Sequence, residues 1–382
     1  MSPIHRFLLW GMIALLVAGC VSATGANPTA LPPASQATLS GPAAVWQASS
    51  PESQGIDSST LAEIFPTIEE RGTILHSLMI LRNEKIVLEA YFYPYSVDRK
   101  HVMFSITKSF MATLTGIALD QGYIGSVDQK IIDLLPDSTF ANPELRKEQI
   151  TLEDVLTMTT GLGWEESDLT FAELYYQEDW LGYVLGKPMV ADPGSRFSYC
   201  SGCSHILSAV LQETTGMNPL DFARENLFEP LEITDFNWET DRSGLPIGGW
   251  GLELTTRDMA KLGTLYLNQG SWEGEQIVPA EWVAAAVDDH VETGGGTAYG
   301  YQWWVYPSYG AYAAFGRGGQ TVFVIPDQEL IVATTAELNN HDPILALIDE
   351  FILPSIRSDE ALPANLEGEK SLQEFIDQIA KP

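Results

Sequence analysis

Residues 104–124 read FSITKSFMATLTGIALDQGYI and hold the most informative local pattern of the chain. From Ser105 to Asp120 the apolar residues recur at helical spacing, and Gly122 is a typical helix stop. The stretch therefore predicts a helix that begins at Ser105 and places Lys108 one turn later on the same face. A hydroxyl at a helix N-terminus meets free backbone N–H groups, which favour developing negative charge.

This pair of side chains indicates a possible nucleophile with its own base. A lysine that is desolvated and neutral can take the proton of a hydroxyl one turn before it. Ser105 is the only serine of the chain with a lysine three positions later. The pattern also arises by chance in many chains of this size, so a capped helix with a surface lysine is the alternative interpretation.

Other catalytic patterns are missing from the sequence. The chain has no GxSxG elbow, no GxxxxGK[ST] phosphate loop and no HExxH zinc helix. Its six histidines never cluster at the spacing of metal ligands. A Ser–His–Asp triad stays open, because its members can lie far apart in a sequence, but no serine other than Ser105 stands out as its nucleophile.

The composition limits the kinds of partner. The 382 residues include 51 acidic and 20 basic side chains, a formal net charge of −31. Such a chain lacks the basic footprint of a nucleic-acid binder and is repelled by anionic lipid surfaces. With 45% apolar residues it is nevertheless an ordinary globular sequence. We expect a monomer that acts on a small molecule.

The N-terminus predicts export. Residues 1–19 have the basic start, apolar run and small-residue end of a signal peptide. The ending Val17-Ala18-Gly19-Cys20 resembles the lipobox of bacterial lipoproteins, which implies a lipid-anchored Cys20 in the cell envelope; an ordinary cleaved signal is the alternative. Residues 21–51 carry no charged side chain, so we expect residues 20–50 to be the lipidated cysteine and a flexible tether.

The remaining pattern predicts one α/β (α+β) domain over residues 51–356, followed by an acidic C-terminal tail or helix over 357–382. Strand-like runs lie near both ends, at 78–81, 86–92, 298–306, 311–315, 321–325 and 330–335. Helical patterns lie at 151–159, 171–185, 203–216, 219–228, 255–267, 344–353 and 370–379. This order predicts about five antiparallel strands flanked by helices, with an inserted helical lobe at about 105–245.

Two further cysteines, Cys200 and Cys203, lie in the run YCSGCS. In an exported protein such a pair could form a disulfide. The other interpretation is two small buried side chains that pack a loop. A four-sulfur zinc site is excluded, because the chain has no second pair of this kind.

Several stretches resemble the penicillin-recognising serine hydrolases, in particular the branch of class C β-lactamases, DD-peptidases, small esterases and 6-aminohexanoate-dimer hydrolases. They follow in the order expected for that family, at 104–124, 150–164, 193–216, 227–233, 248–267 and 315–332. The similarity spans about residues 77–336. It implies a serine β-lactamase/DD-peptidase-like fold with the site between the sheet and the helical lobe, and a reaction that needs neither metal nor organic cofactor.

The resemblance also implies roles for single residues. Ser105 and Lys108 match the family's nucleophile and its lysine. Tyr199 matches the tyrosine of the family's Tyr-x-Asn motif, which helps to activate the serine and to protonate the leaving group. The third position of that motif is Ser201 here. A hydroxyl lacks the reach and the second donor of an amide, which argues against a firm grip on a β-lactam.

The family's Lys/His-Thr/Ser-Gly motif has no clean counterpart, and the matching segment is 315–320. Gly316, Arg317, Gly318 and Gly319 are expected to bind substrate there and to give a backbone N–H that completes an oxyanion hole with the N–H of Ser105. A bend in an edge strand is the alternative. Arg317 either holds a substrate carboxylate or is solvated.

Several residues around these motifs are also candidates. Glu165 and Glu166 are expected at the surface or rim of the site, and His205 is expected to pack in its helix. Four aromatic side chains are candidates either for pocket walls or for the core, namely Trp164, Tyr301, Trp303 and Trp304.

Together these features predict an exported serine hydrolase that cleaves an amide or ester bond of a small substrate through an acyl-enzyme. Two alternatives stay open: a true β-lactamase or DD-peptidase, and a non-catalytic penicillin-binding-like sensor lipoprotein. The predicted mechanism requires a buried Lys108, because an exposed amine stays protonated.

Overall fold

The structure, a computed structural model, describes residues 46–138 and 144–382. The predicted signal peptide (1–19), the lipidation site Cys20 and the tether up to residue 45 lie outside the described residues and stay predictions. Among the described residues, no helix is both long enough and apolar enough to cross a bilayer.

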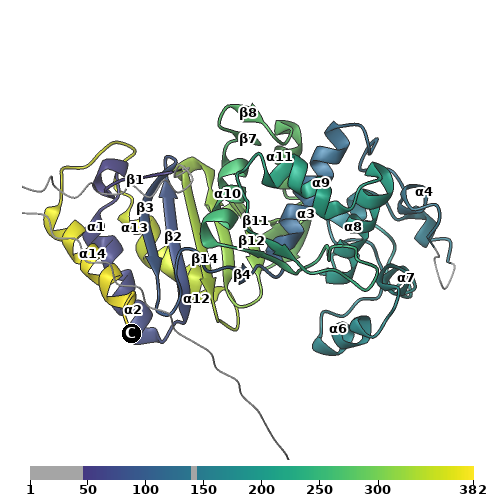
Figure 1. The fold of residues 1–382 in the computed structure, drawn as a ribbon, viewed down its shortest axis with the longest axis horizontal. Helices are drawn as coiled ribbons and strands as arrows, with labels where there is room; N and C mark the ends of the chain where they lie inside the picture. The colour runs from purple at the N-terminus through teal and green to yellow at the C-terminus, as the bar shows by residue number, and fades with distance from the viewer. Residues whose placement is uncertain (1–45, 139–143) are drawn as a thin grey trace, which may run out of the picture. The chain divides into compact units, whose positions relative to one another are not determined.

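Strands from both chain ends build the main sheet (Figure 1). Within the described residues it has nine strands in the order β1-β3-β2-β14-β13-β12-β11-β10-β9. Their bounds are Gln47–Ala48 (β1), Leu75–Arg82 (β2), Lys85–Tyr91 (β3), Val291–Gly294 (β9), Thr297–Tyr299 (β10), Trp304–Tyr306 (β11), Ala311–Gly316 (β12), Gln320–Ile325 (β13) and Leu330–Ala336 (β14). All neighbours are antiparallel except β1 and β3.

The longer strands agree with the sequence patterns, and the short ones do not. β3, β2, β14, β13 and β12 are the five expected antiparallel strands. The expected single strand at 298–306 is wrong: β10 and β11 are separate strands, because Gln302 between them has a positive φ of 61°. β1 and β9 were not expected, since runs of two to four residues are too short to show an alternating pattern.

The folded part begins earlier than residue 51, so the expected tether boundary is wrong by several residues. Trp46 is buried and packs edge-on against Trp272, with ring centroids 6.2 Å apart. β1 then pairs in parallel with β3. The expectation failed because an uncharged stretch rich in Ala, Ser and Pro is typical of a linker. The contact of Trp46 with Trp272 cannot be predicted from the composition of that stretch.

Helices cover both faces of the sheet (Figure 1). One face packs against α3 (Ile106–Asp120), α10 (Thr256–Leu267) and α11 (Ala280–Ala286). The other packs against α1 (Ser58–Ala62), α2 (Ile64–Arg71), α12 (Asp342–Leu347), the π-helical turn η6 (Ile348–Ile352), α13 (Leu353–Ser355) and α14 (Leu366–Ile379). The segment 357–382, expected as a tail or helix, thus contains α14, which packs on this face through Leu372 and Phe375.

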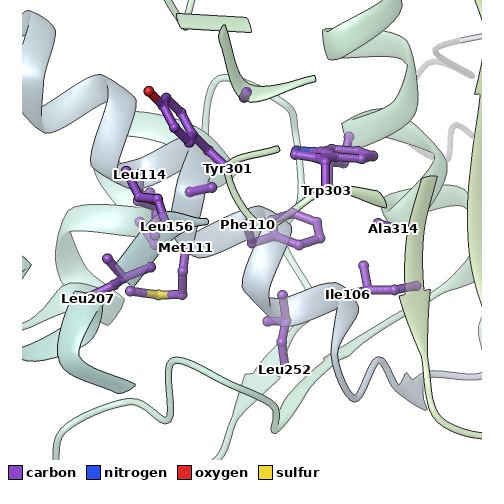
Figure 2. Close-up of a cluster of buried hydrophobic side chains, with 14 of the residues drawn as sticks. Ile106, Phe110, Met111, Leu114, Leu156, Leu207, Leu252, Tyr301, Trp303 and Ala314 are labelled. Carbon is purple, nitrogen blue, oxygen red and sulfur yellow. The ribbon is translucent and has the colours of Figure 1, made fainter. Parts of the chain in front are cut away.

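Two hydrophobic cores, one on each face of the sheet, explain why the central strands have apolar residues at almost every position. Met79 and Leu81 of β2 join the core on the α3 side, whereas Leu78 and Ile80 join the core on the α14 side. Successive side chains of a strand point to opposite faces, so a strand covered on both sides needs apolar residues at every position. Figure 2 shows the first core, where residues of α3 such as Phe110 meet Trp303 and Tyr301.

The helical region between β3 and β9 follows the expected order. It contains α4 (Ile131–Leu134), α5 (Leu152–Leu156), α6 (Asp168–Tyr175), α7 (Trp180–Leu185), α8 (Ser201–Thr215), α9 (Pro219–Ala223) and the π-helical turn η3 (Arg224–Phe228). The helix expected at 171–185 is two helices, each capped by its own side chain, Ser167 for α6 and Asp179 for α7.

Small elements complete the described part of the chain. One sheet has the order β4-β6-β5, with bounds His101–Val102 (β4), Asn237–Trp238 (β5) and Leu252–Leu254 (β6), and a hairpin joins β7 (Ser271–Trp272) to β8 (Glu275–Gln276). Short 3₁₀ turns lie at Glu52–Gln54, Lys147–Gln149, Pro307–Tyr309 and Pro326–Gln328.

Candidate functional site

The backbone before α3 presents the Ser105 hydroxyl. Phe104 has a positive φ of 47°, an unusual conformation for a bulky residue, and turns the chain sharply from β4 into the helix. Ser105 occupies the N-cap position, yet its side chain makes no capping hydrogen bond. The hydroxyl is therefore available to a substrate, since Ser105 lines the cavity described below.

The Lys108 amine lies behind Ser105 and makes three hydrogen bonds. Its Nζ donates to Ser105 Oγ at 2.8 Å, to Ser201 Oγ at 2.9 Å and to the carbonyl of Gly249 at 2.8 Å. The whole side chain is 1% exposed. The requirement that Lys108 be buried is thus met, and the alternative of a surface lysine is wrong.

Burial also changes the chemistry of this amine. Removal from water lowers the pKa of Lys108 from 10.5 to about 8, and the negative charge of Glu166 opposes part of that effect. A substantial fraction of Lys108 is therefore neutral near pH 8. A neutral amine 2.8 Å from a hydroxyl can accept its proton.

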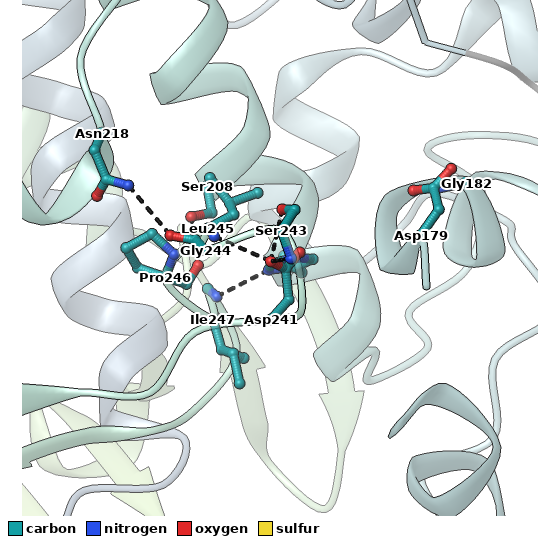
Figure 3. A network of polar contacts seen from close by, with 12 residues as sticks. Asp179, Gly182, Ser208, Asn218, Asp241, Ser243, Gly244, Leu245, Pro246 and Ile247 are labelled. Atoms are coloured by element: carbon teal, nitrogen blue, oxygen red, sulfur yellow. Dashed lines mark hydrogen bonds and ion pairs between the residues drawn. The ribbon is translucent and has the colours of Figure 1, made fainter. Parts of the chain in front are cut away.

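The loop before Gly249 places this residue's carbonyl against Lys108. Asp241 accepts backbone N–H bonds from Ser243 (2.8 Å) and Leu245 (3.0 Å), as Figure 3 shows. Asp241 also contacts His205 Nε2 at 3.1 Å, which ties the loop to α8. A Cβ on Gly249 would lie 2.5 Å from the carbonyl oxygen of Ser201, so only glycine lets the two segments approach this closely.

His205 therefore packs in its helix as expected and also anchors this loop. Its Nδ1 accepts the backbone N–H of Gly248, so Nε2 carries the hydrogen that is donated to Asp241. Burial acts to raise the pKa of Asp241, but hydrogen bonds from His205 and Ser243 outweigh it and lower that pKa to about 2.

The ring of Tyr199 lies close to the Lys108 amine. The amine is 4.9 Å from the centre of its ring, and the ring stacks on Trp304 at 5.8 Å. Burial raises the pKa of Tyr199 above its ordinary value of 10, against a smaller opposite effect of its hydrogen bond with Ser105. Tyr199 therefore keeps its proton at neutral pH and is suited to donate it.

A disulfide follows directly after Tyr199. Cys200 and Cys203 are joined, and both are buried. Cys200 is also the N-cap of α8, since its sulfur accepts the backbone N–H of Cys203. Of the two interpretations of this pair, the structure has the disulfide. It closes the first turn of the helix that carries Ser201.

Glu166 contributes more than the rim position expected for it. It is exposed, as is Glu165, but its carboxylate reaches into the site. Glu166 Oε1 accepts the hydroxyl of Ser201, and Oε2 accepts the Ser201 backbone N–H at 3.1 Å and the indole N–H of Trp164 at 2.6 Å. No spacing rule links residues 166 and 201, so the sequence carried no signal for this contact.

Of the side chains described so far, Ser105, Glu166, Tyr199 and Ser201 line a cavity of about 880 Å³. Its lining residues are mainly aromatic or polar, namely Phe104, Ser105, Glu166, Ser167, Asp168, Phe171, Ala172, Tyr175, Tyr199, Ser201, Trp250, Trp304, Tyr306, Phe315, Arg317, Asn340, His341, Asp342 and Leu345. A cavity of this size suits a small molecule with apolar parts.

Residues 316–319 lie at the end of β12 and in the turn that follows it. Arg317 lines the cavity, where it pairs with Asp168 at 3.2 Å and stays mostly exposed. Gly316 ends β12, and its carbonyl accepts a hydrogen bond from His341 Nε2 at 2.9 Å. Gly318 and Gly319 do not line the cavity: both have a φ of 90° and form the turn into β13. Gly316 is not among the lining residues either, so contact of these three glycines with a substrate stays a prediction.

The four aromatic candidates divide between core and cavity. Trp303 and Tyr301 are buried in the core of Figure 2, and Trp304 lines the cavity. Trp164 is buried and supports Glu166 through its indole N–H. Within the described residues, no three or more His, Cys, Asp or Glu side chains are grouped so that they could hold a metal ion.

Comparison with known proteins agrees with this arrangement. The family model described as Beta-lactamase matches residues 64–352, which is most of the chain. The chain belongs to the beta-lactamase family. The similarity expected from the sequence motifs is thereby confirmed, as is the β-lactamase-like fold of an antiparallel sheet flanked by helices.

Individual members of the beta-lactamase family are distant in sequence. The 6-aminohexanoate-dimer hydrolase of Paenarthrobacter ureafaciens is 23% identical over 303 residues, which cover 71% of this chain and 75% of that protein. A protein of Bacillus anthracis provisionally described as a 6-aminohexanoate-dimer hydrolase superposes with a TM-score of 0.69 at 20% identity, covering 84% and 89% of the two chains. A family VIII carboxylesterase superposes with a TM-score of 0.63 at 16% identity, covering 78% and 97%.

Membership in this family makes the protein a serine hydrolase that acts on amide or ester bonds. The site adds the arrangement that such a reaction needs: a hydroxyl and a protonated phenol that line one cavity, and a buried amine 2.8 Å from the hydroxyl.

Proposed function

We propose that Ser105 is the nucleophile of this hydrolase and that it cleaves a linear amide or ester of a small, partly apolar substrate through an acyl-enzyme. The observation that carries the proposal is the buried Lys108 amine at 2.8 Å from Ser105 Oγ. Burying an amine costs free energy, and here the buried amine lies within hydrogen-bond distance of a hydroxyl that lines the cavity, where it can act as a base.

The proposed reaction uses Lys108 and Tyr199 in turn. Neutral Lys108 accepts the Ser105 proton as the oxygen attacks the substrate carbonyl. The backbone N–H of Ser105 stabilises the oxyanion together with a backbone N–H of the segment 316–319, which begins at the last residue of β12. The Tyr199 hydroxyl supplies the proton of the leaving group and is reprotonated from Lys108. Water then releases the acyl group by the same steps in reverse.

A linear substrate is favoured over a β-lactam by the surroundings of Ser201. Its hydroxyl hydrogen is already donated to Glu166, so it has no donor left for a substrate carbonyl. Relatives named as a 6-aminohexanoate-dimer hydrolase and a carboxylesterase support the same choice. A β-lactamase or DD-peptidase is the second candidate, supported by the family match and by structural neighbours described as penicillin-binding-protein homologues.

A small substrate panel tests the proposal. Purified residues 46–382 should hydrolyse p-nitrophenyl butyrate or a linear 6-aminohexanoate dimer, with nitrocefin and a D-Ala-D-Ala peptide turned over at least about tenfold more slowly in kcat/KM. Nitrocefin as the best substrate would instead favour the β-lactamase candidate. If no member of the panel is hydrolysed and a fluorophosphonate does not label the protein, the proposal fails and a sensor becomes the better interpretation.

The pH dependence should follow the lysine. We expect kcat/KM for p-nitrophenyl butyrate to rise with pH through an apparent pKa near 8, because Lys108 must lose its proton to act as a base and burial lowers its pKa to that value. Tyr199 should add no second limb below pH 10, since its pKa is raised. Rates are measured from pH 6 to 10 after subtraction of spontaneous hydrolysis. A profile that is flat across pH 7–9 would contradict Lys108 as the base.

A further inference from the structure

Glu166 has contacts that the proposed reaction does not yet use. Its carboxylate accepts three hydrogen bonds, two from Ser201 and one from Trp164. The adjacent Glu165 is also exposed but makes no such contact with the site within the described residues. The Glu166 carboxylate thus binds the hydroxyl of Ser201, and the same hydroxyl contacts Lys108.

The direction of the Ser201 hydroxyl follows from this contact. A serine hydroxyl has a single hydrogen to donate, and here it goes to Glu166 Oε1. The oxygen of Ser201 is therefore left as an acceptor toward Lys108 Nζ, 2.9 Å away. Gly249 offers Lys108 a carbonyl oxygen, which is an acceptor in any case.

These two acceptors determine how a neutral Lys108 is oriented. A neutral amine has two N–H groups and one lone pair. If Ser201 and Gly249 each take one N–H, the lone pair has to face the third partner, which is Ser105. If the Ser201 hydrogen were free to rotate, it could be donated to the lone pair, and Lys108 would then turn an N–H toward Ser105 and could not accept its proton.

We propose that Glu166 is a positioning residue that orients the lone pair of Lys108 toward Ser105 by holding the hydroxyl hydrogen of Ser201. The inference rests on the proposed function, because it assumes that Lys108 is the base. It gives the serine at the third position of the motif a physical meaning: Ser201 works together with the carboxylate of Glu166.

The test compares Glu166→Gln with the matched variant Glu165→Gln. A glutamine amide can rotate and donate to Ser201 Oγ, so the hydroxyl hydrogen is no longer held away from Lys108. We expect kcat/KM at its high-pH plateau to fall about 10- to 100-fold in Glu166→Gln, the cost of misorienting a reacting group, and to stay within twofold in Glu165→Gln. Glu166→Asp should recover part of the loss.

Two further readouts separate this role from a merely structural one. The rise of kcat/KM with pH should occur at lower pH in Glu166→Gln. The negative charge of Glu166 raises the pKa of Lys108, so its removal lowers that pKa further. Glu166→Gln combined with Ser201→Ala should be no slower than Ser201→Ala alone, since both act through one hydroxyl. Fluorophosphonate labelling rates should fall in parallel, which reports on Ser105 without any choice of substrate.

The outcomes are distinct from those of the proposed function. If the wild-type protein shows Ser105-dependent turnover but Glu166→Gln equals Glu165→Gln, the inference alone is overturned. Additive losses for Glu166→Gln and Ser201→Ala, or an unmoved pH limb with a lowered melting temperature, would also overturn it, since the carboxylate would then serve to cap α8. If the wild type lacks Ser105-dependent turnover and labelling, the proposed function fails first.

Discussion

Ser105→Ala is expected to lower kcat/KM for the best ester or amide substrate by about 10⁴-fold or more, since removal of a nucleophile leaves only the oxyanion donors and substrate binding. The fold should be unaffected, because the Ser105 side chain makes no capping hydrogen bond and faces the cavity. Steady-state rates and covalent labelling by a fluorophosphonate measure the two aspects of the loss.

The matched control lies one turn further along the same helix. Ser109 is buried and donates to the carbonyl of Gln302 at 2.7 Å, away from the cavity. Ser109→Ala should cost about 1 kcal/mol of unfolding free energy and leave turnover and labelling nearly unchanged. Turnover by Ser105→Ala within tenfold of the wild type would mean that another group is the nucleophile.

Lys108→Met is expected to lower kcat/KM by about 10³-fold, the range of a lost general base. Methionine fills a similar volume without the amine, so Ser105 loses its proton acceptor while α3 keeps its packing. The Ser105 hydroxyl stays in place, and the remaining activity should increase with hydroxide concentration and show no limb near pH 8. The measurement is the pH profile of kcat/KM together with the rate of fluorophosphonate labelling.

A second buried lysine supplies the control for this change. Lys261 of α10 is 6% exposed and donates to the carbonyl of Glu232 at 3.0 Å, outside the cavity. Lys261→Met should change the free energy of unfolding in the same direction as Lys108→Met, because both variants remove a buried amine, but it should leave kcat/KM within about twofold. Equal activity losses in the two variants would attribute the effect to a disturbed fold and would count against Lys108 as the base.

The features that the sequence predicted correctly are those with a local cause. The helix after Ser105 follows from its apolar spacing, and so does the helix expected at 255–267, which is α10. β2 and β3 were found because the runs at 78–81 and 86–92 are apolar or alternating. In the structure a tight turn at Asn83 and Glu84 joins the two strands. Short strands such as β9 and β1 were missed, since a few residues carry no period.

The residues of the site also divide into those that local spacing predicts and those that it does not. Ser105 and Lys108 are one helical turn apart, so their proximity is a property of the helix. Tyr199 and Ser201 were assigned through the family's motifs, and no pattern of spacing connects them to residue 105. Gly249 and His341 were not singled out at all, because the one contributes a carbonyl and the other a hydrogen bond to the end of β12.

The sequence by itself thus determined the family, the order of the elements and the pair formed by Ser105 and Lys108, because each depends on residues close together in the chain or on recognisable motifs. Only the tertiary structure decided that Lys108 is buried, that its three partners are Ser105, Ser201 and Gly249, and that Glu166 holds Ser201. These contacts join segments up to 141 residues apart. Their geometry depends on how α3, α8 and the loop before Gly249 pack, and that packing has no local signature in the sequence.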